Sequence, residues 1–102
     1  MHEGLDIAAA PGTPVFAPAD GNVSFVGYDA GYGKLVIIDH GYGVETRYGH
    51  NAQTHVALGQ KIRKGDLLSN VGNTGRSTGP HLHYEVRVNG APVDPVKYIV
   101  EE

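Results

Sequence analysis

The sequence has no cysteine, no tryptophan and only one methionine among its 102 residues. Without cysteine, neither a disulfide framework nor a thiolate metal site is available. No apolar run approaches the roughly 18 residues of a membrane-spanning helix, so we expect no membrane insertion by this chain. The formal net charge is only −3 and the Lys and Arg residues are scattered, which argues against a nucleic-acid-binding or anionic-membrane surface.

The N-terminus also lacks the apolar stretch of a signal peptide, because Met1 is followed directly by His2 and Glu3. We find no internal repeat and no low-complexity linker. A chain of this length is long enough for one modest core and too short for two. The sequence therefore predicts a single domain over residues 1–102.

Residues that favour β-strands are abundant: 12 Val, five Ile, five Thr and six Tyr. Turn residues recur roughly every 8–12 positions, which is typical of an all-β domain of short strands with little helix. The expected strands cover residues 14–17, 21–28, 33–39, 43–50, 66–71 and 81–88.

Residues 34–39 form an almost continuous apolar run, which predicts a strand buried on both faces. The Gly41-Tyr42-Gly43 segment should turn the chain into a more polar, half-exposed strand, so that the two form a hairpin. Short helical turns are expected only at residues 51–56, where Asn51 is a plausible cap, and at residues 95–98.

Six histidines are unusual in so short a chain. On a strand, His81 and His83 would share one face with Glu85, because alternate side chains point the same way. The opposite face would carry Leu82, Tyr84 and Val86. Neutral imidazole is the commonest metal-ligating side chain, although two ordinary half-exposed strand histidines would give the same pattern. The spacing alone does not say which histidine of the pair binds a metal.

Four further histidines and one carboxylate need to be placed. In extended backbone His2 and Asp6 fall on one face, and two imidazoles with one carboxylate are a ligand set of catalytic zinc. His50 ends an expected strand beside a loop, where catalytic groups are often held, although it could also be a surface histidine. His40 reads as a turn residue bonded to local backbone, and His55 as a loop residue.

Residues 72–80 form a loop of small and polar residues that runs directly into His81. Such a loop can bring backbone N–H groups close to a substrate, and with the turn at residues 28–33 it could wall a narrow groove. It lacks the pattern of a phosphate-binding loop. Three other carboxylates read as solvated strand or turn positions: Asp20, Asp29 and Glu45.

Taken in order, the segments His2-x-x-x-Asp6, Tyr48-Gly49-His50 and Gly75-Arg-Ser-Thr-Gly-Pro-His81-Leu-His83-Tyr-Glu85 resemble the LytM/lysostaphin-type zinc metallopeptidases, peptidase family M23. The resemblance extends over nearly the whole chain. Its spacer segments are similar at residues 11–21, 33–41 and 59–65, and the Asp94-Pro95 pair is similar to the family's closing motif.

This resemblance implies a Zn²⁺ site formed by His2, Asp6 and His83, with His50 and His81 as the two non-ligand histidines that assist catalysis. It assigns His83, and not His81, to the metal. It also implies a mostly antiparallel β-sheet with a substrate groove on one face. The implied activity is endopeptidase cleavage of peptidoglycan stem-peptide cross-links or interpeptide bridges.

Several expectations about context follow from the resemblance. We expect a monomer that acts in the periplasm or the extracellular cell wall on peptidoglycan peptides. Only Met1 precedes His2, where the family usually has more residues, so we expect a catalytic domain taken from a longer protein. D-Ala–diaminopimelate cross-links and glycine bridges are both family substrates, and the lack of a cell-wall-targeting module in the chain favours the former.

Two alternatives differ in class. A catalytically silent LytM-like domain could bind cell wall or activate an amidase, but such relatives lose ligands or catalytic histidines, and all five positions are filled here. A biotinyl- or lipoyl-carrier-like domain would share short segments such as Pro18-Ala-Asp-Gly21. The lysines of this chain, however, are not in the tight-turn setting that a carrier needs.

Overall fold

The computed structural model describes residues 4–74 and 79–94, and over these ranges it contains nine strands and no helix. The strands are β1 (Leu5–Ala8), β2 (Pro14–Phe16), β3 (Gly21–Asp29), β4 (Gly33–Gly41), β5 (Val44–Thr54), β6 (Lys61–Ile62), β7 (Leu67–Val71), β8 (His81–Val88) and β9 (Ala91–Val93). Each strand pair is antiparallel, so the predicted all-β, mostly antiparallel class is confirmed.

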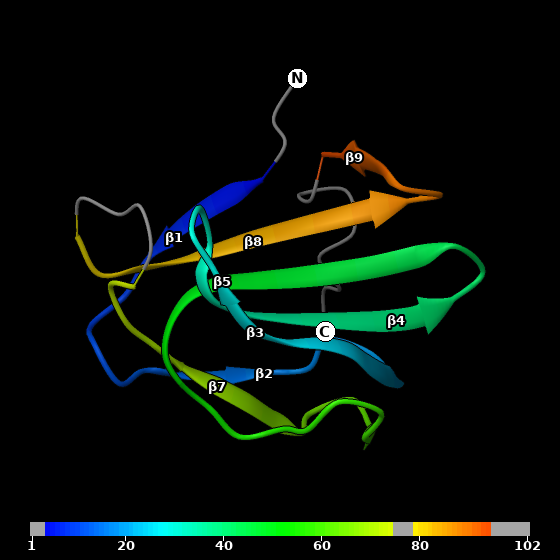
Figure 1. The fold of residues 1–102 in the computed structure, drawn as a ribbon, viewed down its shortest axis with the longest axis horizontal. Coiled ribbons are helices and arrows are strands. Elements are labelled where there is room, and N and C mark those ends of the chain that lie inside the picture. The colour runs from blue at the N-terminus through cyan, green and yellow to red at the C-terminus, as the bar shows by residue number, and fades with distance from the viewer. Residues whose placement is uncertain (1–3, 75–78, 95–102) are drawn as a thin grey trace.

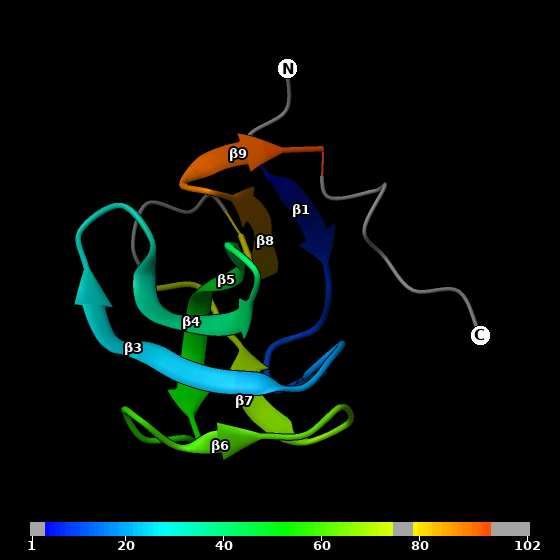
Figure 2. The ribbon, with the colours of Figure 1, turned by 90° about the vertical axis from the view of Figure 1, so that its right-hand side faces the viewer.

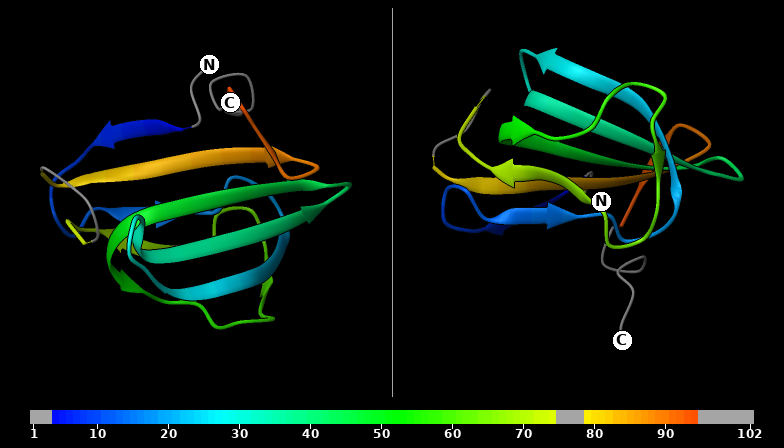
Figure 3. Two further views of the ribbon diagram at one scale, coloured as in Figure 1. Left: turned by 45° about the horizontal axis from the view of Figure 1, so that its top comes forward. Right: turned by 90° about the horizontal axis from the view of Figure 1, so that it is seen from below.

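The main path of the sheet runs β1-β8-β5-β4-β3-β6, with β9 paired to β8 (Figure 1). The long strand β5 also pairs with β7, and β7 pairs with β2, so the sheet curls round on itself (Figure 3). Figure 2 shows the result from the side, with β1 and β9 at one end and β6 and β7 at the other. The core therefore lies inside the curl and draws residues from β2 through β8.

The residues of this core are largely aliphatic, with two tyrosines among them. They are Val15, Ala17, Val23, Val36, Ile38, Tyr48, Ile62, Leu68, Val71, Leu82, Tyr84 and Val86. Tyr48 of β5 and Tyr84 of β8 are cross-strand partners whose rings lie 5.6 Å apart, which ties the two strands together on the core side.

The predicted hairpin is confirmed as β4–β5. Leu35 and Ile37 are buried as well as Val36 and Ile38, so β4 is buried on both faces, as its apolar run predicts. The turn holds three successive residues, 41–43, with φ of 84°, 56° and 78°. Two of the three are glycines, which adopt positive φ without the steric cost that other residues meet.

The helical turn expected at residues 51–56 is wrong, because β5 continues to Thr54. Asn51 does not cap a helix. Its side-chain amide donates to the carbonyls of Lys34 and Tyr48, and this buried position stabilises the strand instead. The other expected turn, at residues 95–98, lies outside the described residues. No helix in the described ranges is long and apolar enough to cross a membrane.

Candidate catalytic and metal site

The candidate site lies on β8, which pairs with β1 on one side and β5 on the other. His83 is opposite Asp6 of β1 and opposite Gly49 of β5. His81, His83 and Glu85 point away from the core, while Leu82, Tyr84 and Val86 are buried in it. The predicted division of the two faces is therefore confirmed.

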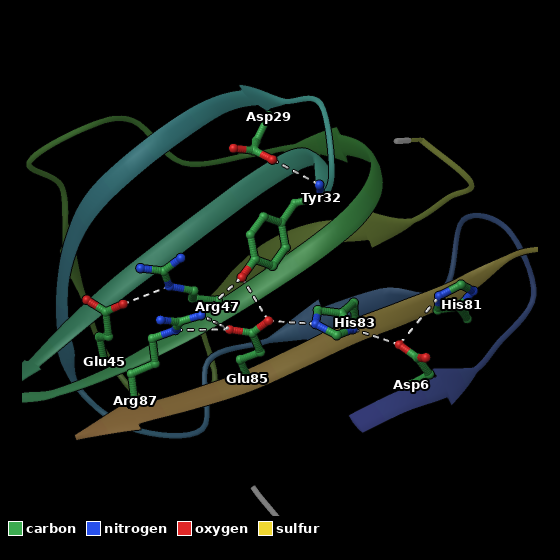
Figure 4. Close-up of polar contacts among 9 residues, drawn as sticks. All are labelled: Asp6, Asp29, Tyr32, Glu45, Arg47, His81, His83, Glu85 and Arg87. Atoms are coloured by element: carbon green, nitrogen blue, oxygen red, sulfur yellow. Dashed lines mark hydrogen bonds and ion pairs between the residues drawn. The ribbon is translucent and has the colours of Figure 1, made fainter. Parts of the chain in front are cut away.

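The His83 ring lies between two carboxylates (Figure 4). Its Nδ1 is 2.7 Å from Oδ1 of Asp6, and its Nε2 is 2.7 Å from Oε2 of Glu85. The two carboxylates differ in exposure: the Asp6 side chain is 65% exposed and that of Glu85 only 5%. The site is therefore open on the Asp6 side and closed on the Glu85 side.

Glu85 is the centre of a buried polar network. The Tyr32 hydroxyl donates to Oε2 at 2.8 Å, and Nε of Arg87 donates to Oε1 at 3.1 Å. Burial raises the pKa of Glu85, but the hydrogen bonds from His83, Tyr32 and Arg87 outweigh it and lower the pKa to about 2. The hydrogen bond to Glu85 in turn raises the pKa of His83, against the opposing effect of burial and with help from Asp6.

His81 lies beside the same carboxylate as His83. Its Nε2 is 3.5 Å from Oδ1 of Asp6, and its Nδ1 is 2.7 Å from the carbonyl oxygen of Gly79. A carbonyl oxygen can only accept, so Nδ1 carries the proton and donates it there. In the neutral ring, Nε2 then holds the lone pair on the side that faces Asp6.

His50 is held in the same way from β5. Its Nδ1 lies 2.5 Å from the carbonyl oxygen of Thr74, so this nitrogen also carries the proton. The His50 ring is 4.8 Å from that of His81 and 5.9 Å from that of His83, between centroids. His50, which the sequence singled out at the end of an expected strand, therefore lies beside the histidine pair of β8.

The backbone of His50 is in the left-handed region, with φ of 63°. It lies where the pairing of β4 and β5 shifts register, between Val36 and Lys34. The His50 N–H donates to the carbonyl of Tyr32 at 2.6 Å, which fixes this conformation. Non-glycine residues in such backbone cluster at functional sites, and bulges next to active sites serve to re-aim a side chain.

Of the sequence-predicted site residues, the structure brings Asp6, His50, His81 and His83 together. His2 lies outside the described residues, and within residues 4–74 and 79–94 there is no group of three His, Asp or Glu side chains arranged to hold a metal ion. The donor chemistry nevertheless fits zinc, because a ring nitrogen and a carboxylate oxygen converge between β8 and β1.

The other two histidines lie elsewhere. Nδ1 of His40 is 2.7 Å from the carbonyl oxygen of Asp20, and its Nε2 is 2.7 Å from the Thr46 hydroxyl. The expectation that His40 bonds local backbone is wrong, since its backbone partner is 20 residues away. His55 follows β5, as expected for a loop residue, and its Nε2 contacts Oδ1 of Asn70.

Sequence reasoning gave no role to three residues of the network: Tyr32, Glu85 and Arg87. Spacing could have found Glu85, because it follows His83 by two residues on the same face of β8. Tyr32 could not be found in this way, since 53 residues separate it from Glu85. It belongs to the turn between β3 and β4, where Oδ1 of Asp29 accepts from the N–H groups of Gly31 and Tyr32.

The other two carboxylates expected at solvated positions, besides Asp29, have structural partners. Oδ1 of Asp20 accepts from the Lys64 N–H at 2.8 Å, and Glu45 pairs with Nε of Arg47 at 2.7 Å. The Arg47 guanidinium also lies over the Tyr32 ring, 5.9 Å from its centroid.

The loop at residues 72–80 is attached to β5 through Thr74, whose hydroxyl donates to the Asn51 carbonyl. Residues 75–78 of this loop lie outside the described residues.

The model of peptidase family M23 matches residues 1–95 of this chain. The chain is 54% identical over 96 residues to the DD-carboxypeptidase/endopeptidase Mpg of Neisseria meningitidis serogroup B, a match that covers 94% of this chain. The chain belongs to peptidase family M23. It spans 22% of the length of that relative.

Solved structures agree with this assignment. A zinc-containing peptidase from Vibrio cholerae superimposes with a TM-score of 0.88 at 41% identity, over 91% of this chain and 29% of the other. The catalytic domain of lysostaphin from Staphylococcus simulans superimposes with a TM-score of 0.91 at 30% identity, over 97% of this chain and 79% of the other. The curled all-strand sheet is therefore the fold of this family.

Proposed function

We propose that this domain is a zinc-dependent endopeptidase that hydrolyses peptide cross-links of bacterial peptidoglycan. The observation that supports it most is the position of His83. Its ring lies with one nitrogen on the buried Glu85 and the other 2.7 Å from Asp6; the His50 ring is 5.9 Å from it between centroids, and the His81 ring is 4.8 Å from that of His50. Such a cluster of titratable groups open to solvent on one side is typical of an active site.

His2, Asp6 and His83 are the proposed metal ligands. With a proton on Nε2 donated to Glu85, His83 presents the lone pair of Nδ1 toward Asp6. Zinc in a site with two imidazoles and one carboxylate keeps an open position, lowers the pKa of bound water to about 7 and polarises a carbonyl. His2 supplies the second imidazole of this set.

His50 and His81 are the proposed catalytic histidines. Each has its Nδ1 proton directed to a backbone carbonyl, so Nε2 of the neutral ring can accept a proton. One ring can take the proton of the attacking water and pass it to the nitrogen of the leaving amine. In its charged form, a ring can also donate from Nε2 to the substrate oxygen as negative charge develops there.

The substrate we propose is a cross-link between stem peptides, in which the scissile bond joins two D-configured centres, as in D-Ala–diaminopimelate. The name of the Neisseria relative, a DD-carboxypeptidase/endopeptidase, supports this choice over a glycine bridge. Peptidoglycan lies outside the cytoplasmic membrane, so the proposed place of action is the periplasm or the extracellular cell wall.

The test combines metal analysis with defined substrates. We expect one zinc per chain by atomic absorption, and new product masses from cross-linked muropeptides that disappear when zinc is chelated. Products from glycine-bridged peptides alone would contradict the proposed bond. Zinc binding without any hydrolysis would contradict the proposed activity and favour a binding domain.

A further inference from the structure

The two nitrogens of His83 both face carboxylates, and only one of them can bind a metal. Which nitrogen is left with its lone pair depends on the hydrogen bond that the other makes. The two carboxylates compete unequally, because the Glu85 side chain is almost wholly buried and that of Asp6 is mostly exposed. Because Glu85 is buried, it has fewer alternative partners than Asp6 and a fixed position. We therefore expect Glu85 to determine which nitrogen of His83 carries the proton.

Glu85 is held in one orientation by groups on both of its oxygens. Oε1 accepts from Nε of Arg87 at 3.1 Å, and a terminal guanidinium nitrogen of Arg87 forms an ion pair with the same oxygen, also at 3.1 Å. Oε2 accepts from the Tyr32 hydroxyl at 2.8 Å and contacts His83 at 2.7 Å. Rotation of the carboxylate would break several of these contacts at once, so Oε2 remains directed at Nε2 of His83.

The backbone of Gly4 closes the same contact from outside. A Cβ at this position would lie 2.6 Å from Cε1 of His83, 2.7 Å from its Nε2 and 2.9 Å from Cγ of Glu85. Residues 4–6 therefore pass directly over the His83–Glu85 pair before Asp6 reaches Nδ1. The absence of a side chain at Gly4 allows this close approach.

Tyr32 connects this pair to the catalytic side of the cluster. Its hydroxyl donates to Glu85, while its carbonyl accepts the N–H of His50. One turn, held by Asp29, thus supports both the carboxylate behind His83 and the backbone of His50.

We propose that Glu85 is a positioning residue for the metal site. Oriented by Tyr32 and Arg87, it holds the proton of His83 on Nε2 and leaves Nδ1 as the metal-binding atom. The inference rests on the proposed function for the identity of the metal. Outer partners of this kind typically change metal affinity by about 10–100-fold when they are removed.

The first experiment measures zinc affinity of the full chain by competition with a chelator. We expect Glu85→Ala to weaken zinc binding by about 10–100-fold. Glu85→Gln should stay within a few-fold of the original chain, because its amide oxygen can still accept from Nε2. Tyr32→Phe should fall between the two, since it leaves the carboxylate in place with one contact fewer.

Glu45→Gln is the matched control. Glu45 is also a glutamate paired with an arginine, and it lies opposite Arg87 in the sheet, but it contacts Arg47 and not His83. We expect its zinc affinity to be unchanged. Equal losses in Glu45→Gln and Glu85→Ala would show a general effect of negative charge and would overturn the proposal.

The second measurement needs no variant, so it tests which nitrogen of His83 binds the metal even if Glu85→Ala does not fold. Long-range ¹H–¹⁵N spectra of the zinc-loaded chain should show His83 with a proton on Nε2 and the metal on Nδ1. Zinc on Nε2 would overturn the proposal. Correct ligation without hydrolysis would contradict only the proposed activity, whereas hydrolysis with an unaffected Glu85→Ala would contradict only the role of Glu85.

Discussion

Two polar clusters, one with three histidines and one with His40 alone, have opposite characters. In the first, His50, His81 and His83 face one another, and carboxylates contact two of them. In the second, both nitrogens of His40 face neutral oxygens, and the Thr46 hydroxyl continues to the Tyr48 hydroxyl at 2.6 Å. The first cluster is the proposed site of metal binding and proton transfer, while the second connects the Asp20 backbone, through His40 and Thr46, to the buried Tyr48.

The comparison shows that the partners of a histidine indicate its role better than its burial or its place in a strand. His40 is the last residue but one of β4, beside a turn, and His50 lies in β5 beside a bulge, so their local settings are similar. Substitution in the first cluster should therefore change chemistry, and substitution in the second should change stability.

The largest effect is expected for His83→Ala. Its loss removes a proposed metal ligand and leaves Glu85 without one of its donors, so zinc and hydrolysis should both be lost. Bound zinc and release of peptides from cross-linked peptidoglycan measure the two quantities on one preparation. A His83→Ala protein that keeps full zinc occupancy would contradict the assignment of His83 as a metal ligand.

Next come His81→Ala and His50→Ala. Each should keep zinc but slow hydrolysis by about 10²–10⁴-fold, the range expected for loss of a general acid or base or of an oxyanion donor. The measurement is kcat/KM on a defined muropeptide with zinc content as the control. Activity close to that of the original chain in His81→Ala would contradict the proposed catalytic role of His81.

Acidification should weaken zinc binding through the same cluster. Ligand imidazoles must be neutral, and the pKa of His83 is raised, above all by its hydrogen bond to Glu85, so protons compete with zinc as pH falls. Because this pKa is raised above the ordinary histidine value, we expect the affinity to be declining already at about pH 6.5 and to fall further below it, by up to about tenfold per pH unit for each ligand histidine. Chelator competition at several pH values tests this, and an unchanged affinity at about pH 4.5 would contradict a two-histidine site.

A smaller effect on rate is expected for His40→Ala. It should change hydrolysis by less than about tenfold but lower the free energy of unfolding by about 1–3 kcal/mol, because the Asp20 carbonyl and the Thr46 hydroxyl lose their partner. Denaturant unfolding, compared with hydrolysis at a temperature where the protein is folded, separates the two effects. Loss of activity with unchanged stability would contradict the structural role assigned to His40.

The smallest effect is expected for His55→Ala. The contact between His55 and Asn70 is exposed, and such surface substitutions usually change stability by no more than about 0.5 kcal/mol. Zinc content and hydrolysis should equal those of the original chain. Complete loss of activity in a folded His55→Ala protein would show that the site has been misplaced.

The sequence predicted the longer strands well, because their alternation and their bounding turns extend over enough residues to be read. It did not predict β1, β6 and β9, which have only four, two and three residues. The helical turn expected at Asn51 failed for another reason. Local preference favours Asn as a cap, but the long-range bond to Lys34, available only once β4 and β5 have paired, determines its conformation.

For the candidate site, alternation on β8 predicted that His81 and His83 share one face, and the structure has them so. Spacing and strand position also singled out Asp6 and His50, while their roles come from the resemblance to the family and stay predictions. The supporting contacts depend on topology: Tyr32 and Glu85 meet only because β4, β5 and β8 lie side by side in the sheet. The same is true of the bond between His40 and the Asp20 carbonyl, which no local pattern encodes.

The left-handed backbone at His50 sets stability against activity at one position. Asparagine and glycine adopt a φ of 63° more readily than histidine, and relief of such strain is worth of order 1 kcal/mol. Selection for heat resistance alone should therefore enrich Asn at position 50, whereas selection for cell-wall lysis should retain His. Libraries built to make this domain more stable should keep His at position 50, because the residue expected to fold best there is not the one proposed to act in hydrolysis.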